Sequence, residues 1–504
     1  MPFTSRRGAT AVIAAIALLA VATGTGGAAA SSRARSEPLK VSKSIGYLYG
    51  GTISHGVDTL AVAANHTTTL VKETASPGGD IGGMAILHLP SGVYLYVLAG
   101  SFGGQGSVYT YAVNIRTGAL TRTKAAPVPL VLAAERGNNL YPYDGFATGP
   151  GGESVLYALR CLTPACSAYG IVRYHPNPKT GALTLTAKPV SSEVDWMSLE
   201  GNRLAILTRD SHHQEGIVPG KITHSTGALS IGTFFGLVTN DNPPVPATAD
   251  MVTAGPSSVG VGGIYVGGKD PGPLVAVYPS SGLHVAAGAG VDEAGTPSAM
   301  LFIPHLLLTG ESSSAGGPLL QLVSPSGVTS AGSIDLTKAP YLEGDGGGSS
   351  DPNFPETIYT LGAGVYIGNY SGLIVQGTDG YAGKGFELNQ THPTVAGTTS
   401  TTSMAGFLKP SATKTTLHVK HKGGKILVSG SVTPSVGGLP VSVTLSALIG
   451  KKLKPLQHKT ATLTKKGHFS ASMARPKPAH CRVTASFTGD ATWAPSSRTL
   501  TFPC

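Results

Sequence analysis

One four-residue phrase, Thr-Gly-Ala-Leu, occurs three times in the first half of the chain. It stands in NIRTGALT (114–121), NPKTGALT (177–184) and HSTGALS (224–230). Segments in which apolar and polar residues alternate flank the copies, for example SVYTYAV before Asn114. Such alternation around a glycine at a tight bend is typical of a β-hairpin. The phrase therefore predicts a repeated turn of a scaffold and not a binding motif.

Weaker versions of this hairpin extend the repeat along most of the chain. Seven hairpins begin near residues 60, 107, 170, 216, 274, 319 and 373, about 52 residues apart on average. This spacing is typical of four-stranded propeller blades. A second hairpin is expected before each of the later ones, at 86–100, 146–160, 197–209, 251–268, 298–310 and 356–370.

The first copy has only one strand of its second hairpin, IGYLYGGT (45–52). The segment SMAGFLKPS (403–411) aligns with GMAILHLPS (83–91), so we expect it to supply the missing strand. A strand from the far end would remove an open sheet edge. We predict a seven-bladed β-propeller over 44–411, after an N-terminal linker at 31–43. The alternative is a disordered Gly/Ser-rich region that repeats by chance.

The strands YLYVLAG (94–100) and GIYVGG (263–268), with the TGALT turns, resemble seven-bladed propellers of the lactonase type. That group contains bacterial 6-phosphogluconolactonases and YVTN-repeat surface proteins, and the resemblance covers the whole propeller region. It implies Pro-Arg-His-like strand entries at the central pocket, but the entries here read GMAIL, DGFAT, DWMSL and ADMVT. No catalytic residue is carried over, and we favour a non-catalytic protein over an enzyme.

After residue 411 the sequence becomes a series of short alternating segments. Six or seven such strands within about 94 residues suit an immunoglobulin-like sandwich, which we place at 412–504. SFTGDATWAPSSRTLTF (486–502) resembles the closing motif of bacterial Ig-like repeats. The expected fold class is all-β, a seven-bladed β-propeller with a C-terminal immunoglobulin-like β-sandwich.

The N-terminus predicts export. Residues 1–30 combine Arg6 and Arg7, an apolar stretch and Ala28-Ala29-Ala30, which is typical of a secretory signal peptide. The alternative, a membrane anchor, needs a longer apolar stretch, and no other segment could span a bilayer. We expect a secreted or cell-surface protein, monomeric, without a transmembrane segment after signal removal.

Four cysteines are consistent with export. We predict two disulfides, Cys161–Cys166 and Cys481–Cys504. A metal site is the alternative, although neither pair has CxxC spacing.

Acidic residues suggest where a site could lie. Of 25 Asp and Glu in residues 1–410, 19 fall in loops that we assign to one face of the propeller. Asp144, Asp195 and Asp250 stand just before the innermost strand of successive blades, where they would line the channel mouth. Crowded carboxylates bind a divalent cation such as calcium, or act as acids. The alternative is that longer loops simply collect polar residues.

Three further motifs are weaker candidates for a metal site. DSHHQE (210–215) could hold a surface metal, and TNDNPP (239–244) and GDGGGSSDPN (344–353) have the composition of calcium loops. For all three we favour a solvated loop.

Charge divides the chain in two. Residues 411–504 hold 14 Lys/Arg and one acid, a net charge of +13, whereas residues 31–410 carry −5. A basic domain of an exported chain is attracted to an anionic cell-wall polymer or surface polysaccharide, or to another protein; nucleic acid is not expected. We predict an exported binding or scaffold protein, and the alternative is a lactonase-like hydrolase that uses a divalent cation at the acidic mouth.

Overall fold

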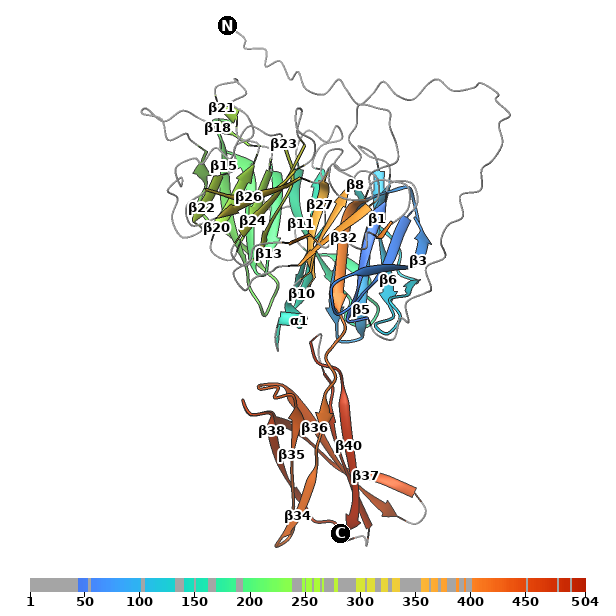
Figure 1. Cartoon of the computed structure of the whole chain (residues 1–504). Coiled ribbons are helices and arrows are strands. Elements are labelled where there is room, and N and C mark those ends of the chain that lie inside the picture. The colour runs from blue at the N-terminus through green and yellow to red at the C-terminus, as the bar shows by residue number, and fades with distance from the viewer. Residues whose placement is uncertain are drawn as a thin grey trace, which may run out of the picture. The chain divides into compact units, whose positions relative to one another are not determined.

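The computed structural model consists almost entirely of β-strands (Figure 1). One four-residue helix, α1 (Gly145–Thr148), is present among the described residues, and none of the described helical structure is long enough to cross a membrane. The signal peptide and linker predicted at 1–43 lie outside the described residues. The structure describes residues 44–504 except 53–55, 101–104, 132–139, 149–150, 162–168, 187–193, 238–246, 250, 256–257, 263–264, 267–275, 280–295, 304–305, 313–318, 325–328, 336–354, 362–363, 370–372, 379–386, 389–393, 396–400, 450–451, 478–479 and 490–491.

The first sheet joins the two ends of the region from 44 to 411. Its strand order is β3-β2-β1-β32, with β1 at Gly46–Thr52, β2 at Gly56–Val62, β3 at Thr68–Ala75 and β32 at Thr401–Leu408. Strands β1 and β32 are antiparallel, and Tyr47 lies opposite Phe407. The prediction that segment 403–411 completes the first sheet is therefore confirmed.

The following sheets repeat the same antiparallel order. The next three are β4 (Asp80–Leu89), β5 (Gly92–Gly100), β6 (Gln105–Val113) and β7 (Leu120–Arg122), with β8 (Val128–Val131) beside β6; β9 (Leu140–Asp144), β10 (Ser154–Cys161), β11 (Tyr169–Pro176) and β12 (Leu183–Leu185); and β13 (Val194–Glu200), β14 (Arg203–Arg209), β15 (Glu215–Ile222) and β16 (Leu229–Ile231), with β17 (Phe235–Gly236) beside β15.

The later sheets continue the series. They are β19 (Met251–Ala254), β20 (Ser258–Gly262) and β22 (Ala276–Pro279), beside the pair β18 (Ala247–Thr248) and β21 (Tyr265–Val266); β23 (Thr296–Ile303), β24 (Leu306–Ser312), β25 (Leu319–Ser324) and β26 (Thr329–Asp335); and β27 (Pro355–Leu361), β28 (Gly364–Asn369), β29 (Leu373–Thr378) and β30 (Glu387–Leu388), with β31 (Thr394–Val395) beside β29.

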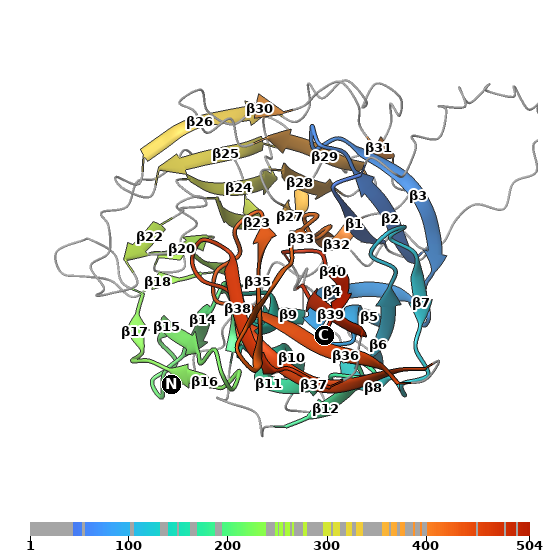
Figure 2. The same cartoon turned by 90° about the horizontal axis from the view of Figure 1, so that it is seen from below.

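One edge strand of each sheet contacts the corresponding edge strand of the next sheet. Such contacts link β32 with β4, β4 with β9, β9 with β13, β13 with β19, β19 with β23, β23 with β27, and β27 with β32. In Figure 2 the strands β23, β24, β25 and β26 follow one another outward from this inner set. Separate apolar cores fill the spaces between neighbouring sheets, for example Tyr49, Ile86 and Leu95 between the first two.

The Thr-Gly-Ala-Leu turns dock onto the preceding sheet. The hydroxyl groups of Tyr49, Tyr96 and Tyr157 donate to the carbonyl oxygens of Gly118, Gly181 and Gly227 at 2.9, 2.9 and 2.5 Å. The three glycines have φ values of +70°, +70° and +57°, which favour glycine. A Cβ there would lie 2.3–2.5 Å from Tyr47, Tyr94 or Val155. The phrase is part of the scaffold, as predicted.

One predicted hairpin is wrong in its details. Residues 146–160 were expected to form two strands, but the inner strand β9 ends at Asp144 and α1 follows it. The main-chain N–H of Ala147 donates to Asp144 Oδ1 at 3.2 Å, which satisfies a free donor at the start of this turn. Side-chain capping by Asp144 therefore turns the sequence GFAT into a helical turn in place of a strand.

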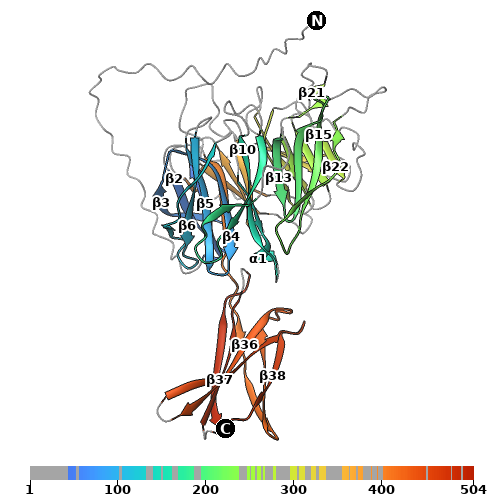
Figure 3. The same cartoon turned by 180° about the vertical axis from the view of Figure 1, so that it is seen from behind.

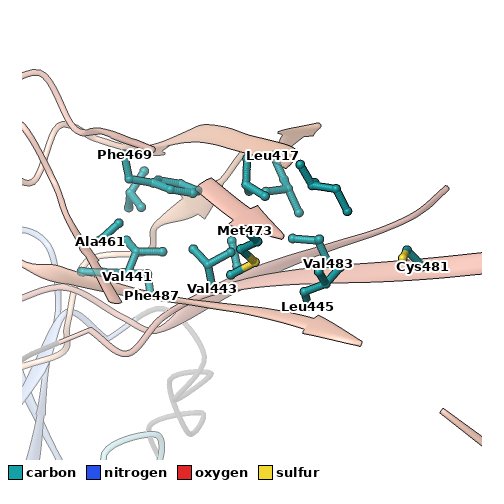
Figure 4. Close-up of a cluster of buried hydrophobic side chains, with 14 of the residues drawn as sticks. Leu417, Val441, Val443, Leu445, Ala461, Phe469, Met473, Cys481, Val483 and Phe487 are labelled. Carbon is teal, nitrogen blue, oxygen red and sulfur yellow. The ribbon is translucent and has the colours of Figure 1, made fainter. Parts of the chain in front are cut away.

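The C-terminal region consists of two sheets around one apolar core (Figure 4). One sheet has β33 (Lys414–Thr415), β34 (His418–Lys422), β35 (Lys425–Thr433) and β38 (His468–Ala474). The other has the order β37 (Lys452–Thr462), β36 (Pro440–Ile449), β39 (His480–Phe487) and β40 (Ser496–Pro503). Figures 1 and 3 both show β36 beside β37.

The disulfide predicted between Cys481 and Cys504 is present and joins the start of β39 to the end of the chain. The other predicted pair is not tested, because Cys166 lies outside the described residues and the side chain of Cys161, at the end of β10, is not described.

Candidate functional site

Asp144, the first of the three predicted carboxylates, lies at the end of β9 and is surrounded by protein donors. Its Oδ2 accepts the main-chain N–H of His88 at 2.9 Å and contacts the ring Nδ1 of His88 at 2.5 Å. Its Oδ1 accepts the N–H of Ala147 and the hydroxyl of Ser154, the latter at 2.9 Å. Both carboxylate oxygens are thus engaged, which leaves little capacity for a bound cation.

His88, near the end of β4, is the residue that sequence reasoning missed. Because Nδ1 faces a carboxylate oxygen at hydrogen-bond distance, we assign a proton to Nδ1. Nε2 is buried and has no hydrogen-bond partner among the described residues. The ring packs edge-on against Phe407, with 6.4 Å between centroids. The only signal in the sequence was one polar residue within the apolar run from Met84 to Leu89.

The aromatic surroundings of this pair stay uncharged. Burial raises the pKa of Tyr96, and the charges of Tyr94 and Asp144 add to the rise. Burial also raises the pKa of Tyr359 to about 12; the hydrogen bond that the N–H of Gly406 donates to its phenol oxygen lowers this pKa in part, and the charge of Asp144 raises it further. The Asp144 charge therefore acts on tyrosines from two other sheets.

Asp195, the second predicted carboxylate, belongs to a separate cluster. Its Oδ2 lies 3.4 Å from Arg209 Nε. Arg209 also donates to Glu215 Oε1 from Nε and Nη2, at 3.1 and 2.7 Å. The other oxygen of Glu215 accepts the N–H of Ala249 at 2.8 Å, so a buried carboxylate ties β15 to the segment before β19.

The three carboxylates were expected at equivalent positions, just before an inner strand. The structure contradicts this for Asp144, which is the last residue of β9, whereas Asp195 is the second residue of β13. The helical turn α1 follows Asp144, so the first strand of this sheet lies before Gly145 and not after it. Asp250 lies outside the described residues. Cation or ligand binding by Asp144, Asp195 and Asp250 stays a prediction.

The structure describes one of the three weaker candidate motifs, DSHHQE. In DSHHQE, Asp210 Oδ1 accepts the N–H groups of His212 and Gln214 at 2.8 and 2.9 Å, which is typical of a polar turn. No group of three His, Cys, Asp or Glu that could hold a metal occurs among the described residues. The segments 239–244 and 344–353 lie outside the described part of the chain.

The C-terminal region presents cations to solvent. Every Lys and Arg that the structure describes between 411 and 504 is exposed, and none of the described residues there is Asp or Glu. The hairpin of β34 and β35 alone carries Lys420, Lys422 and Lys425, and Lys422 pairs with Lys425 across the strands. The Lys and Arg side chains of this region therefore face solvent without any described Asp or Glu among them.

Comparisons with known proteins leave the family open. No protein-family model matches the chain, and no curated protein sequence matches it. The structure is similar to a candidate 6-phosphogluconolactonase from Bacteroides uniformis ATCC 8492, with 11% identity, a TM-score of 0.47 and coverage of 72% of this chain and 99% of the other. A second candidate 6-phosphogluconolactonase, from Bacteroides fragilis NCTC 9343, gives 11% identity, a TM-score of 0.46 and coverage of 73% and 99%.

An exo-β-1,3-galactanase from Phanerochaete chrysosporium is similar over 90% of this chain and 100% of its own, with 7% identity and a TM-score of 0.29. At these identities and TM-scores, none of the three likenesses assigns an activity to this chain.

Proposed function

We propose that the protein is an exported, monomeric binding or scaffold protein that attaches to an anionic polymer of the cell envelope. In this proposal the sheets from β1 to β32 form a closed seven-bladed β-propeller of the lactonase and YVTN-repeat type, which presents a face to a ligand or partner protein. The two-sheet C-terminal region is an immunoglobulin-like module, and its cations hold the protein at a cell-wall polymer or surface polysaccharide.

One observation carries the proposal: thirteen lysines and arginines between 411 and 504 are exposed in the described structure, and no Asp or Glu is described there. Solubility requires net charge but not the near-absence of one sign, because mixed surface charges serve it equally well. A surface of one sign accumulates polyanions by long-range attraction, which salt screens. The geometry therefore suits a repeating anionic partner.

The test measures binding of the full chain to purified anionic cell-wall polymer over a salt series. The Debye length falls from about 10 Å at 0.1 M salt to about 3 Å at 1 M, so binding should weaken strongly over that range. Reversal of the hairpin charges, with Lys420→Glu, Lys422→Glu and Lys425→Glu, should weaken binding at low salt.

A matched control reverses three exposed cations outside the C-terminal region, Arg116, Lys124 and Lys179. This second triple variant has the same net charge as the first and should bind like the unaltered chain. Binding that is insensitive to salt, or equal loss in both variants, would contradict attachment through the C-terminal module.

Hydrolysis is the second candidate function, and His88 favours it. An imidazole held by a carboxylate, with its other nitrogen unpaired, resembles a general base, but Nε2 is buried, so a substrate reaches it only if the neighbouring side chains move. The cation-dependent form of this alternative is less favoured, because both oxygens of Asp144 already accept protein donors. Turnover of ester or lactone substrates that disappears in His88→Gln, while the fold is kept, would support a hydrolase over a pure binding protein.

A further inference from the structure

The outward face of the sheet β37-β36-β39-β40 is a regular array of hydroxyl groups. On β36 the buried residues Val441, Val443 and Leu445 alternate with Ser442, Thr444 and Ser446, none of which is buried. Strand β39 alternates in the same way, with Arg482, Thr484 and Ser486 directed away from the core. We call the outward residues of these four strands the hydroxyl face.

The register aligns the hydroxyl face into rows that cross all four strands. Each row takes one residue from β37, β36, β39 and β40 in turn, and the rows are Thr460–Ser442–Ser486–Ser497, His458–Thr444–Thr484–Thr499 and Pro455–Ser446–Arg482–Thr501.

Hydrogen bonds order the middle row. Thr484 and Thr499 share a bond of 3.0 Å between their hydroxyl groups, and Thr444 Oγ1 lies 3.3 Å from His458 Nδ1. The side chains are therefore held in a defined arrangement even though they face solvent.

The spacing of this array suits a repeating polar ligand. Neighbouring strands lie about 4.8 Å apart, and residues on one face of a strand recur about every 6.8 Å. Each hydroxyl group can both donate and accept a hydrogen bond, so the face offers alternating partners to another set of hydroxyl groups. Apart from the imidazole of His458, the three rows hold neither an aromatic nor a large aliphatic side chain. Protein interfaces are enriched in aromatic residues and depleted in serine, so a protein partner is disfavoured.

The charge on the hydroxyl face indicates the kind of polymer. Arg482 stands within the third row, next to Ser446 and Thr501, and the four strands contain no carboxylate. The other exposed cations of these strands lie on the opposite face of the sheet, because Lys454, Lys459 and Arg498 pair with the buried Ala447, Val443 and Ala485. Hydroxyl rows that hold a cation and no carboxylate complement a chain that carries both hydroxyl groups and negative charges.

We propose that the hydroxyl face binds an acidic polysaccharide. Sugar hydroxyl groups pair with the serine and threonine rows, and an acidic group of the polymer lies against Arg482. This inference rests on the proposed function, since it names the surface and the ligand class through which the basic module attaches.

The probe is a polyuronic acid, and the readout is its binding to the full chain. Ser442→Ala with Ser486→Ala removes two hydroxyl groups that face each other across β36 and β39. The control, Ser429→Ala with Ser470→Ala, removes a facing pair from β35 and β38 in the other sheet. Both pairs change the same atoms at solvent-facing positions, so neither should alter the net charge or the thermal unfolding curve.

We expect about a tenfold loss of affinity in the first double variant, because two hydrogen bonds of about 0.7 kcal/mol each correspond to that factor. The control should bind like the unaltered chain. A second variant, Thr484→Val with Thr499→Val, keeps shape and strand propensity and should show a comparable loss.

Three outcomes would overturn the inference. Equal binding by the variants and the control would contradict binding at the hydroxyl face. It would be compatible with attachment through Lys420, Lys422 and Lys425. Equal affinity for an uncharged polysaccharide would contradict the part assigned to Arg482. A complete lack of binding by the unaltered chain, to the polyuronic acid and to cell-wall polymer at low salt, would remove the proposed function itself.

Discussion

The hydroxyl of Tyr157 in β10 donates a hydrogen bond of 2.5 Å to the main-chain carbonyl of Gly227, 70 residues later in the chain. The bond connects the second strand of one sheet to the turn between the third and fourth strands of the next. Tyr49 and Tyr96 make the same connection to Gly118 and Gly181. The Thr-Gly-Ala-Leu phrase therefore recurs because each of these turns packs against a tyrosine of the preceding sheet.

Replacement of Gly227 by alanine should destabilise the protein through a steric clash. The new Cβ would lie 2.5 Å from Val155 Cγ1, in addition to the strain of φ +57°. Gly201 has the same φ and no atom within 4 Å of its Cβ position, so it provides a matched control. We expect Gly201→Ala to lower the free energy of unfolding by about 1 kcal/mol. Gly227→Ala should lower it by about 2–4 kcal/mol, because overpacking adds to the backbone cost. Urea unfolding measures both, and equal losses would contradict the docking of the turn.

Replacement of Arg209 by methionine should leave the buried carboxylate of Glu215 without its cation. Breaking a buried pair by removing one partner costs about 3–5 kcal/mol, and we expect about 3 kcal/mol here because Arg209 is one-third exposed. Arg116→Met, at an exposed turn position, should change the free energy of unfolding by less than about 0.5 kcal/mol. A second replacement, Glu215→Gln, should restore part of the loss in the Arg209 variant. Absence of any rescue would argue that the two side chains act independently.

Alkaline pH should destabilise the protein through Tyr157. Burial, partly opposed by Arg173, raises the pKa of Tyr157 to about 12. In the unfolded chain a tyrosine ionises near pH 10. Between these values the unfolded state loses its proton first, so the free energy of unfolding falls as pH rises from about 10 to about 12. Tyr157→Phe should be less stable near neutral pH but show a smaller decline in this window. Urea unfolding at a series of pH values, together with tyrosinate absorbance, tests the slope; an identical slope in the variant would assign the effect to other groups.

Calcium should leave the melting temperature of the protein unchanged if the carboxylate of Asp144 only stabilises the fold through hydrogen bonds. Its oxygens accept the N–H groups of His88 and Ala147 and the hydroxyl of Ser154. Asp144→Asn should lower the free energy of unfolding by about 1–3 kcal/mol, because one oxygen acceptor is replaced by a donor. A calorimetric scan with and without calcium checks the first expectation on the unaltered chain. A rise in melting temperature that the Asn variant abolishes would revive the cation site.

The sequence was most informative where a local pattern has one physical solution. A glycine at a tight bend between alternating segments predicted the hairpins, and the alignment of SMAGFLKPS with GMAILHLPS predicted the pairing of β32 with β1. Periodicity could not detect the capped turn after Asp144, because Gly-Phe-Ala-Thr is also a plausible strand. It could not pair His88 with Asp144 either, since 56 residues separate them and their contact exists only when β4 and β9 lie side by side.

The pairing of β1 with β32 also has a consequence for the order of assembly. Strand β1 is among the first described segments to be synthesised, but its partner begins only at Thr401. Until then one edge of β1 exposes unpaired main-chain groups, which can pair with other chains. A nascent chain must therefore reach residue 408 before its earliest sheet is complete. A chain that ends before that point would keep an unpaired, aggregation-prone edge on β1 even if its other sheets had folded.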